Sequence, residues 1–389
     1  MEDRKELKKR IIVTGGGSGG HVSTASSIIK ILQNKYSNFQ ENLLYVGGDL
    51  GMQDEKPGDS IEKRIFSKEN FNQKYIRAGK FQRKFSLKSI SRLLRVVLGF
   101  FDSINIIKEF KPDIIISTGG FVSVPVCIVA KLFKAEIYLH EQTAVVGLSN
   151  KIVGKFAKKI FISFPSSEKY FPKDKVIHTG NLLRQEIFNK SGSGPIVEAL
   201  KEMIEIQEEY PIIYISGGSL GSHCINTTVK DALQPLLQDY QIVLQTGDNK
   251  TFNDYDCLNK EKRKLREDLQ RRLLLVKYVQ NNEIGYLLNN IDLFVGRSGA
   301  NTVYEMGILR IPSILIPIPW VTHNEQTMNA QILQNVGLAE IMNEGELTPE
   351  QLVIKIGSFL KKERKINDQM LKDIFKKDAD RKILEYLQL

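Results

Sequence analysis

A histidine directly after a glycine-rich turn is the residue in this chain best suited to do chemistry. Residues 11–21 read Ile-Ile-Val-Thr-Gly-Gly-Gly-Ser-Gly-Gly-His, an apolar run that breaks into glycines before His21. A strand, a glycine turn and a helix start in this order present backbone amides that bind anions. An imidazole, with a pKa of about 6.5, can accept a proton at neutral pH. The pattern predicts a general base beside an anion site, and the alternative is a histidine that only caps or packs locally.

Two further glycine turns follow apolar runs. One is Gly217-Gly218-Ser219-Leu220-Gly221 after Ile212–Ser216, and the other is Gly119-Gly120 after Ile114–Ser117. In an open parallel sheet such turns emerge at the carboxyl edge of the strands and line one crevice. Two strand–turn–helix units in the two halves of the chain predict two nucleotide-binding-like domains with a cleft between them.

The second half carries polar groups suited to a nucleotide sugar. A turn at Gly296–Gly299 precedes a helix starting at Ala300, whose first amides would suit a diphosphate. Glu305 lies in that helix, where a carboxylate could hold a ribose diol; the alternative is an exposed helix glutamate. The amides and hydroxyls after Pro317, Gln326 among them, are groups that read sugar hydroxyls.

Two other ligand classes have weaker signals. Gly15-x-Gly17-x-x-Gly20 fits the dinucleotide fingerprint, but the acidic residue expected at the end of the second strand has only Asp49 as a displaced candidate. The Asp-x-Asp triplet Asp254-Tyr255-Asp256 lies in the charged segment Asn249–Arg272, away from any glycine turn, and is predicted to be surface. The sequence therefore predicts no metal and no cofactor.

Composition describes an ordinary globular chain of 389 residues, with 42% hydrophobic and 26% charged residues. The three cysteines have no metal-ligand spacing, which fits a reducing cytosol. There is no secretory signal pattern at the start and no apolar run near the ~20 residues needed to cross a bilayer. The formal net charge of +10 suits an anionic membrane, a phosphorylated substrate or nucleic acid, but no basic-aromatic platform for nucleic acid is found.

Short β-branched runs alternate with longer helical stretches, which predicts an α/β fold of two Rossmann-like, doubly wound parallel-sheet domains. The expected domains are 1–184 and 185–366, with a change of domain between Gly180 and Pro211, and a helical segment 367–389 that could return to the first domain. The predicted strands are Ile11–Thr14, Leu43–Gly47, Ile114–Ser117, Glu136–His140, Lys159–Ser163, Val176–Thr179, Ile212–Ser216, Gln241–Gln245, Leu273–Val279, Asp292–Val295, Ser313–Pro317 and Ala339–Met342.

The segment Gly79–Phe110 has the pattern of an amphipathic helix. Its basic residues at helical spacing are Lys84, Lys88, Arg92 and Arg95. Its apolar stripe consists of Leu87, Ile90, Leu94, Val97 and Phe101, widened by Leu93, Phe100 and Ile104. Such a helix can lie on an anionic lipid surface, or it can pack its apolar stripe on the sheet. The sequence leaves both open.

The motifs together resemble the MurG family, glycosyltransferases that add N-acetylglucosamine to the lipid-linked muramyl-pentapeptide precursor of peptidoglycan. The corresponding stretches, in order from about Ile11 to Gln334, are Gly16–His21, Gly119–Ser123, His140–Thr143, Gly147–Lys151, Gly180–Arg184, Gly217–Ser222, the helix from Ala300 to Glu305, and the segment after His323. Any one motif is weak, but the ordered series is specific. Thr143 stands where the family carries asparagine.

The resemblance implies a two-domain enzyme of the GT-B type, with the lipid acceptor on the first domain and UDP-N-acetylglucosamine on the second. The substrate-binding positions it implies are Ser18, Gly19, Gly20, Thr143, Arg184, Ser219, Val279, Ala300, Asn301, Thr302, Val303, Tyr304, Glu305 and Gln326. Val279 would meet uracil, Glu305 the ribose, Ser219 and the Ala300 helix start the diphosphate, and Gln326 the sugar. The partners would be this donor, an undecaprenyl-linked acceptor and the anionic cytoplasmic face of the cell membrane, to which the enzyme would bind peripherally.

The expected chemistry is a single inverting, metal-independent displacement. His21 would act as the general base or orient the acceptor hydroxyl, with Glu141 as a second candidate carboxylate. Helix-start amides and Arg184 would stabilise the departing diphosphate. The competing functions are a glycolipid synthase that uses a UDP-sugar, an NAD-dependent oxidoreductase resting on Gly15–Gly20, and a non-catalytic nucleotide-sugar-binding protein.

Overall fold

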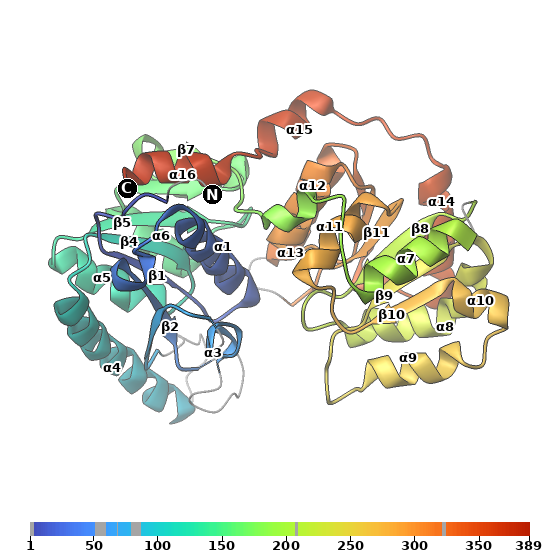
Figure 1. Ribbon diagram of the computed structural model, residues 1–389, viewed down its shortest axis with the longest axis horizontal. Helices are drawn as coiled ribbons and strands as arrows, with labels where there is room; N and C mark the ends of the chain where they lie inside the picture. The colour runs from blue at the N-terminus through green and yellow to red at the C-terminus, as the bar shows by residue number, and fades with distance from the viewer. Residues whose placement is uncertain (1–3, 51–59, 68, 79–86, 207–208, 321–323) are drawn as a thin grey trace. The chain divides into compact units, whose positions relative to one another are not determined.

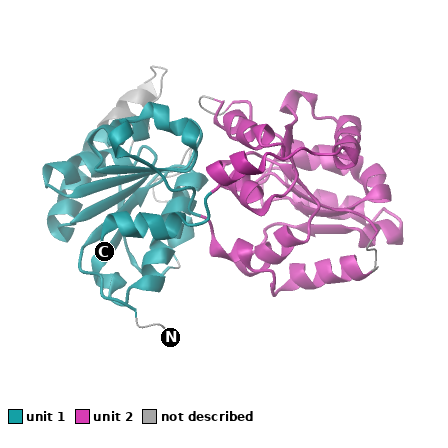
Figure 2. Ribbon diagram, turned by 90° about the horizontal axis from the view of Figure 1, so that it is seen from above, with its two compact units in different colours: residues 1–182, 376–389 teal, residues 183–375 magenta. Residues whose placement is uncertain are grey.

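The chain folds into two compact units, each built on its own parallel sheet (Figure 2). The computed structural model describes residues 4–50, 60–67, 69–78, 87–206, 209–320 and 324–389, and the side chains of 87–94 are not described. Unit 1 consists of residues 1–182 and 376–389, and unit 2 of residues 183–375. Each unit is considered by itself below.

Unit 1 contains a seven-stranded sheet in the order β3-β2-β1-β4-β5-β6-β7, with every neighbouring pair parallel (Figure 1). Its strands are β1 Ile11–Gly15, β2 Leu43–Gly48, β3 Asn72–Ile76, β4 Ile114–Gly119, β5 Glu136–Glu141, β6 Lys159–Ile162 and β7 Val176–His178. Its helices are α1 Gly19–Lys35, α2 Phe39–Asn42, α3 Ile61–Phe66, α4 Leu87–Phe110, α5 Ser123–Leu132, α6 Leu148–Phe156 and α16 Ala379–Leu387, with 3-10 turns η1 Pro165–Tyr170 and η2 Lys173–Lys175.

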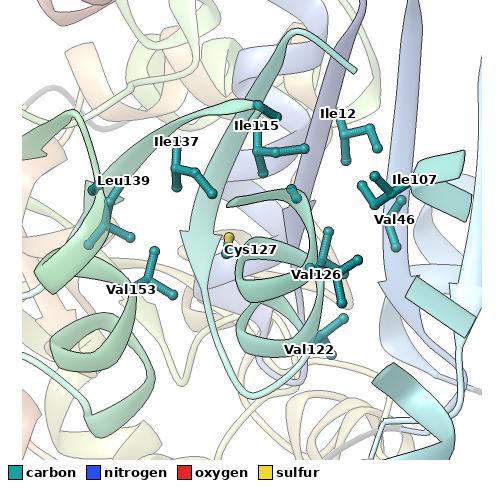
Figure 3. Packing of buried hydrophobic residues seen from close by; sticks show 14 of the residues in the cluster. Ile12, Val46, Ile107, Ile115, Val122, Val126, Cys127, Ile137, Leu139 and Val153 are labelled. Carbon is teal, nitrogen blue, oxygen red and sulfur yellow. The ribbon is translucent and has the colours of Figure 1, made fainter. Parts of the chain in front are cut away.

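Two apolar clusters, one on each face of this sheet, hold unit 1 together. Strands β1, β2, β4 and β5 are buried on both faces because helices cover them, which is why their sequences read as continuous apolar runs. In one cluster Ile115, Ile137 and Leu139 of the sheet meet Val126 and Cys127 of α5 (Figure 3). This packing fixes the carboxyl ends of β1, β4 and β5, where the glycine turn, the second turn and the His140–Thr143 stretch begin.

The C-terminal helix α16 packs on unit 1. Ala379, Ile383 and Leu387 join the cluster that contains Tyr138 and Phe161. The backbone carbonyl of Leu389 accepts a hydrogen bond from Tyr36, and that of Tyr386 accepts one from Tyr138. The last residues therefore pack against the first unit although they follow the second in the chain.

Unit 2 has a six-stranded parallel sheet in the order β10-β9-β8-β11-β12-β13. Its strands are β8 Ile212–Ser216, β9 Gln241–Gln245, β10 Leu273–Val276, β11 Leu293–Gly296, β12 Ser313–Leu315 and β13 Ala339–Ile341. Its helices are α7 Pro195–Ile206, α8 His223–Asp239, α9 Asp254–Lys262, α10 Glu267–Arg271, α11 Asn281–Asn289, α12 Ala300–Leu309, α13 Glu325–Asn335, α14 Pro349–Lys361 and α15 Asp368–Ile374, with 3-10 turns η3 Gln185–Phe188 and η5 Glu344–Glu346.

All twelve predicted strands occur, and one strand was missed. β3 carries only one fully buried residue, Ile76, because it lies at the edge of its sheet, so its sequence lacks the apolar run of a covered strand. The strand predicted to reach Val279 ends at Val276, and the one predicted to reach Pro317 ends at Leu315. In the part of the chain that the structure describes, no helix is long and apolar enough to span a bilayer.

Candidate active site

The side chain of His21 is held at one ring nitrogen and leaves the other available. His21 is the third residue of α1, and its Nδ1 lies 2.8 Å from the carbonyl oxygen of Thr118 at the end of β4. A carbonyl oxygen only accepts, so Nδ1 carries the proton and donates it. Nε2 then keeps its lone pair, which is the form a general base needs.

Gln142 contacts the same ring nitrogen. Its side-chain amide lies 2.7 Å from His21 Nδ1 and 3.0 Å from the hydroxyl of Thr24. The amide nitrogen Nε2 is the atom beside the ring, the amide oxygen Oε1 accepts from the Thr24 hydroxyl, and that hydroxyl also lies 3.1 Å from the carbonyl oxygen of Gly20. The imidazole is therefore oriented by groups from three different segments of unit 1.

Two glycines leave room at the free side of the ring. Gly119 and Gly120 have φ of +100° and +86°, a conformation that side chains other than glycine rarely adopt. A Cβ atom at Gly119 would lie 2.9 Å from His21 Cε1, and one at Gly120 would lie 3.2 Å from Cδ2. These two ring carbons flank Nε2, so a side chain at either position would crowd the ring nitrogen that keeps its lone pair.

The protein environment keeps His21 neutral. Burial lowers the pKa of its imidazole below the ordinary value of 6.5, and the hydrogen bond to the Thr118 carbonyl opposes this only in part. At neutral pH the ring is therefore unprotonated at Nε2.

The first and third glycine turns meet in unit 1, as the sheet-edge argument predicts. The amide of Gly16 donates to the carbonyl of Gly119 over 3.2 Å. Gly19 and Gly20 are exposed at the start of α1, and Ser18, the residue before the helix, is half-buried and makes no side-chain capping bond within the described residues. The α1 start thus presents an uncapped first turn beside His21.

Glu141 and Thr143 are buried behind this site. Thr143 donates its amide and its hydroxyl to Glu141 Oε1, at 2.9 and 2.8 Å, and Asn150 donates its amide nitrogen to Glu141 Oε2 at 2.8 Å. Burial raises the pKa of Glu141 above the usual range. Glu141 is engaged within the protein, so its geometry suits a structural role better than that of a second base.

In unit 2 the predicted ribose and diphosphate residues form an ion pair. Arg184 donates from Nε and Nη2 to the two carboxylate oxygens of Glu305, at 2.8 and 3.0 Å. The alternative of an exposed Glu305 is wrong, because only 8% of this residue is exposed. The guanidinium group of Arg184 forms a bidentate pair with Glu305. The carboxylate oxygens of Glu305 keep lone pairs that can accept from a ribose hydroxyl.

The start of α12 and the second glycine turn are open. No side chain of the described residues caps α12, so the amides of Ala300, Asn301 and Thr302 can bind an anion. The amide of Val303 already donates to Gly299, and the side chains of Val303 and Tyr304 lie in the core. Ser219 is exposed in the second turn.

Val279 and Gln326 lie in loops or at helix starts. Val279 is half-buried in the segment between β10 and α11. Gln326, in the first turn of α13, accepts a hydrogen bond from the amide of Ile318 at its Oε1. This contact orients the side chain and leaves its NH₂ group as the donor for a sugar hydroxyl. His323, beside it in sequence, lies outside the described residues.

Sequence reasoning missed one buried cation. Arg297, directly after β11, is 7% exposed and donates to the hydroxyl of Ser222 at 2.8 Å and to the carbonyl of Ile316 at 3.1 Å, and it pairs with Glu344. It ties the start of α8 to the loop after β12. The sequence signal for it was an arginine within the glycine turn Gly296–Gly299, directly after an apolar strand. A charged side chain at that place is not needed to fill an apolar core.

One prediction about an acidic residue needs correction. Asp254 is not a surface residue: it is 9% exposed and accepts hydrogen bonds from His223 and Asn226. Asp49, the displaced candidate for a dinucleotide ribose, pairs with Arg95 of α4. Within the described residues no three His, Cys, Asp or Glu side chains gather as a metal site.

Sequence comparison matches both halves of the chain to one family of glycosyltransferases. The glycosyltransferase family 28 N-terminal domain matches residues 11–162, and the C-terminal domain of that family matches residues 212–385. A UDP-N-acetylglucosamine–N-acetylmuramyl-(pentapeptide) pyrophosphoryl-undecaprenol N-acetylglucosamine transferase of Acetivibrio thermocellus is 33% identical over 94% of this chain and 92% of its own. A Bacillus cereus protein of the same description is 35% identical over 95% of both. The chain belongs to the MurG family of glycosyltransferases.

Solved structures agree on the fold. MurG of Acinetobacter baumannii superimposes with a TM-score of 0.70 at 21% identity, covering 98% of this chain and 99% of that one. A UDP-GlcNAc 2-epimerase of Neisseria meningitidis also superimposes, with a TM-score of 0.58 at 14% identity over 98% and 99% of the two chains. Both show the GT-B arrangement of this MurG-family chain, and because an epimerase shares it, the fold alone does not select the reaction.

Proposed function

We propose that this enzyme transfers N-acetylglucosamine from UDP-N-acetylglucosamine to an undecaprenyl-diphosphate-linked N-acetylmuramyl-pentapeptide, with inversion and without a metal. The observation that carries the proposal is the match over more than nine-tenths of the chain to relatives whose descriptions state this transfer. The arrangement around His21 supports it, because a transferase needs a group that can take the proton of the acceptor hydroxyl.

Unit 1 supplies the base. The acceptor hydroxyl attacks the anomeric carbon of the donor sugar while the bond from that carbon to the diphosphate oxygen breaks. The hydroxyl proton passes to Nε2 of His21, whose Nδ1 is held by the Thr118 carbonyl. As the ring becomes positively charged, that carbonyl stabilises the imidazolium. Gly119 and Gly120 have no side chains, and a side chain at either position would block the approach of the hydroxyl.

Unit 2 holds the donor. Glu305 accepts from the ribose hydroxyls and is oriented by Arg184. The first amides of α12 and the turn around Ser219 bind the diphosphate, and they take up its charge as it leaves. The NH₂ group of Gln326 donates to the sugar, and Val279 lies against the uracil ring of the donor. Thr143, buried on Glu141, acts by supporting the segment that carries Gln142.

An apolar surface on unit 1 suits a lipid-linked acceptor. Val97, Leu98 and Phe101 of α4 are 49%, 37% and 59% exposed. Leu132 and Phe133, at the end of the neighbouring α5, are exposed too. Phe100 and Ile104 pack on the core, so α4 packs part of its apolar stripe on the unit and leaves Val97, Leu98 and Phe101 exposed to meet lipid. Of the basic residues, Arg95 is paired with Asp49, and Lys84, Lys88 and Arg92 lie outside the described side chains.

This surface supports peripheral attachment to the cytoplasmic face of an anionic membrane. Exposed apolar side chains on a helix insert at the lipid boundary, and the formal net charge of +10 adds attraction to anionic headgroups. No nucleic-acid partner is proposed.

The deciding experiment is a transfer assay with UDP-N-acetylglucosamine and the undecaprenyl muramyl-pentapeptide acceptor in the presence of a chelator. The expected product is the disaccharide-linked lipid, formed at the same rate with and without chelator. A parallel reaction with diacylglycerol tests the glycolipid-synthase alternative, and product from that acceptor alone would overturn the proposal. Donor binding without any product would favour the non-catalytic alternative.

A further inference from the structure

Asn150, in the first turn of α6, has a buried amide oxygen without a partner. Only 3% of the residue is exposed. Its Nδ2 donates to Glu141, but its Oδ1 has no hydrogen-bond partner among the residues that the structure describes. Buried polar atoms are nearly always paired, so an exception calls for a reason in the function of the site.

The amide lies against the same glycine as the proposed base. A Cβ atom at Gly119 would lie 2.7 Å from Asn150 Oδ1 and 2.9 Å from His21 Cε1. The imidazole and the amide of Asn150 therefore both lie against Gly119, with Asn150 Oδ1 and His21 Cε1 at most about 5.6 Å apart, the sum of these two distances, and a side chain at this position would collide with both. Cε1 is the ring carbon between the two nitrogens, which becomes strongly polarised when the ring is protonated.

The orientation of this amide is set from behind. Glu141 Oε1 is occupied by the amide and hydroxyl of Thr143, and Oε2 accepts from Asn150 Nδ2. An amide whose nitrogen is held by a carboxyl group must direct its oxygen elsewhere. Because this oxygen is buried, its dipole is screened less than it would be in water and acts more strongly on a nearby ionisable group.

We propose that Asn150 is a positioning residue of the transfer reaction, whose amide oxygen, held in place by Glu141, stabilises the protonated form of His21. Asn150 does not touch the substrate, because its oxygen is buried. It acts when His21 takes the proton of the acceptor hydroxyl and the ring gains a positive charge. The inference rests on the proposed function in that it takes His21 to be the base.

The other groups around His21 do not duplicate this role. The Thr118 carbonyl and the Gln142 amide hold Nδ1. Glu62 of α3 accepts from the amide of Gly17 at 2.9 Å, on the side of the first glycine turn. Glu141 bonds to Asn150 and Thr143, and burial raises the pKa of its carboxyl group. Asn150 thus couples the carboxyl group of Glu141 to the imidazole of His21, because it bonds to the first and lies near the second.

The test follows the titration of His21 directly, in the full-length protein with ¹³C-labelled histidine, by NMR. The chain has five histidines, and the His21 signal is assigned from its absence in His21→Gln. In Asn150→Leu the stabilising oxygen is gone, so His21 should titrate at a pH lower by at least about half a unit. Asn150→Asp keeps an oxygen at that place, so His21 should titrate at or above the wild-type pH. Asn150→Ala replaces Asn150→Leu if the larger side chain prevents folding.

Unit 2 offers a matched control. Asn226 is also buried, also donates to a carboxylate, Asp254, and also has an amide oxygen without a partner among the described residues. Asn226→Leu should perturb folding to a similar degree yet leave the His21 titration unchanged. An unchanged His21 titration in Asn150→Leu, or an equal fall in Asn150→Asp, would overturn the inference.

Kinetics separate this inference from the proposed function. In the pH profile of kcat/KM, the acid limb of Asn150→Leu should move to lower pH with the NMR titration, and its plateau should fall because the base is weaker. If His21 titrates as expected but no variant, including the wild type, transfers sugar to the lipid acceptor, the proposed function fails and the electrostatic role of Asn150 stands. If the wild type is active and the acid limb does not move, the inference alone fails.

Discussion

The two units place a histidine, a buried asparagine and an acidic residue next to a glycine turn, but connect them differently. In unit 2 the carboxylate of Asp254 holds both His223, at 2.7 Å, and Asn226, at 2.9 Å. His223 also stacks on Phe252 with ring centroids 3.9 Å apart. In unit 1 the acid, Glu141, accepts from Asn150 and Thr143, and His21 bonds to a backbone carbonyl instead. A histidine tied to a carboxylate anchors a helix start, whereas one held by a carbonyl among glycines can exchange a proton.

Exchange of each histidine for glutamine is the strongest test of this difference. His21→Gln removes the proton acceptor, so kcat should fall by about 100- to 10,000-fold while UDP-N-acetylglucosamine binds as before. His223→Gln keeps a polar side chain at the start of α8 and should lower kcat by less than about tenfold. Steady-state kinetics and calorimetric donor titration measure both. Equal losses in the two variants would mean that the comparison assigns the base wrongly.

Unit 1 should also be the unit that acid weakens. Burial lowers the pKa of His140, in β5, to about 4, with the Gly180 backbone opposing the shift. His140 binds a proton near pH 6.5 in the unfolded chain and only near pH 4 in the folded chain. The neutral His140 therefore makes its full contribution to the free energy of unfolding above pH 6.5. This contribution should be lost by about 1.4 kcal/mol per pH unit as the pH falls through that window.

His140→Leu should flatten this dependence. Urea unfolding between pH 7 and 4, followed by far-UV circular dichroism, measures both units. The fluorescence of Trp320, the one tryptophan of the chain, follows unit 2 alone. An equally steep loss in wild type and His140→Leu would show that another group causes it.

The charged pair of unit 2 should control donor affinity, in contrast to the neutral base of unit 1. Glu305→Gln removes a charged acceptor of the ribose hydroxyls and should weaken UDP binding by about 10- to 100-fold. A UDP analogue without ribose hydroxyls should bind the wild type about as weakly, and the variant should no longer distinguish the two ligands. If Glu305→Gln still prefers UDP by the full wild-type factor, the carboxylate does not contact the ribose.

Membrane binding should depend on unit 1 only, with the smallest of these effects. Phe101→Asp puts a charge on the exposed face of α4 and should lower binding to anionic vesicles by several-fold to about tenfold. Ile354 of α14, 60% exposed in unit 2, provides the matched control, and Ile354→Asp should bind as the wild type does. Flotation at low and high salt measures both, and equal loss in the two variants would contradict a lipid surface on α4.

Much of the fold could be predicted because covered parallel strands must be apolar on both faces. Runs such as Ile114–Ile116 and Ile213–Ile215 have no alternating polar residues, and glycines mark where each run ends. β3 could not be predicted in the same way, because an edge strand need not be apolar: Gln73 and Lys74 lie within it. Asp254 was misjudged because a run of charged residues gives no sign of which one turns inward to His223 and Asn226.

The sequence by itself determined the two-sheet architecture, the turns at the strand ends and the importance of His21, since these follow from local patterns of apolar residues, glycines and an imidazole. Only the tertiary structure decided which nitrogen of His21 is free, that Glu305 pairs with Arg184, and that Asn150 and the base lie against the same glycine. His21 and Thr118 are 97 positions apart in the chain, and Arg184 and Glu305 are 121 positions apart. Asn150 follows His21 by 129 positions, and both lie against Gly119. Local propensity carries no information about such pairs, and the packing of helices against a shared sheet edge creates them.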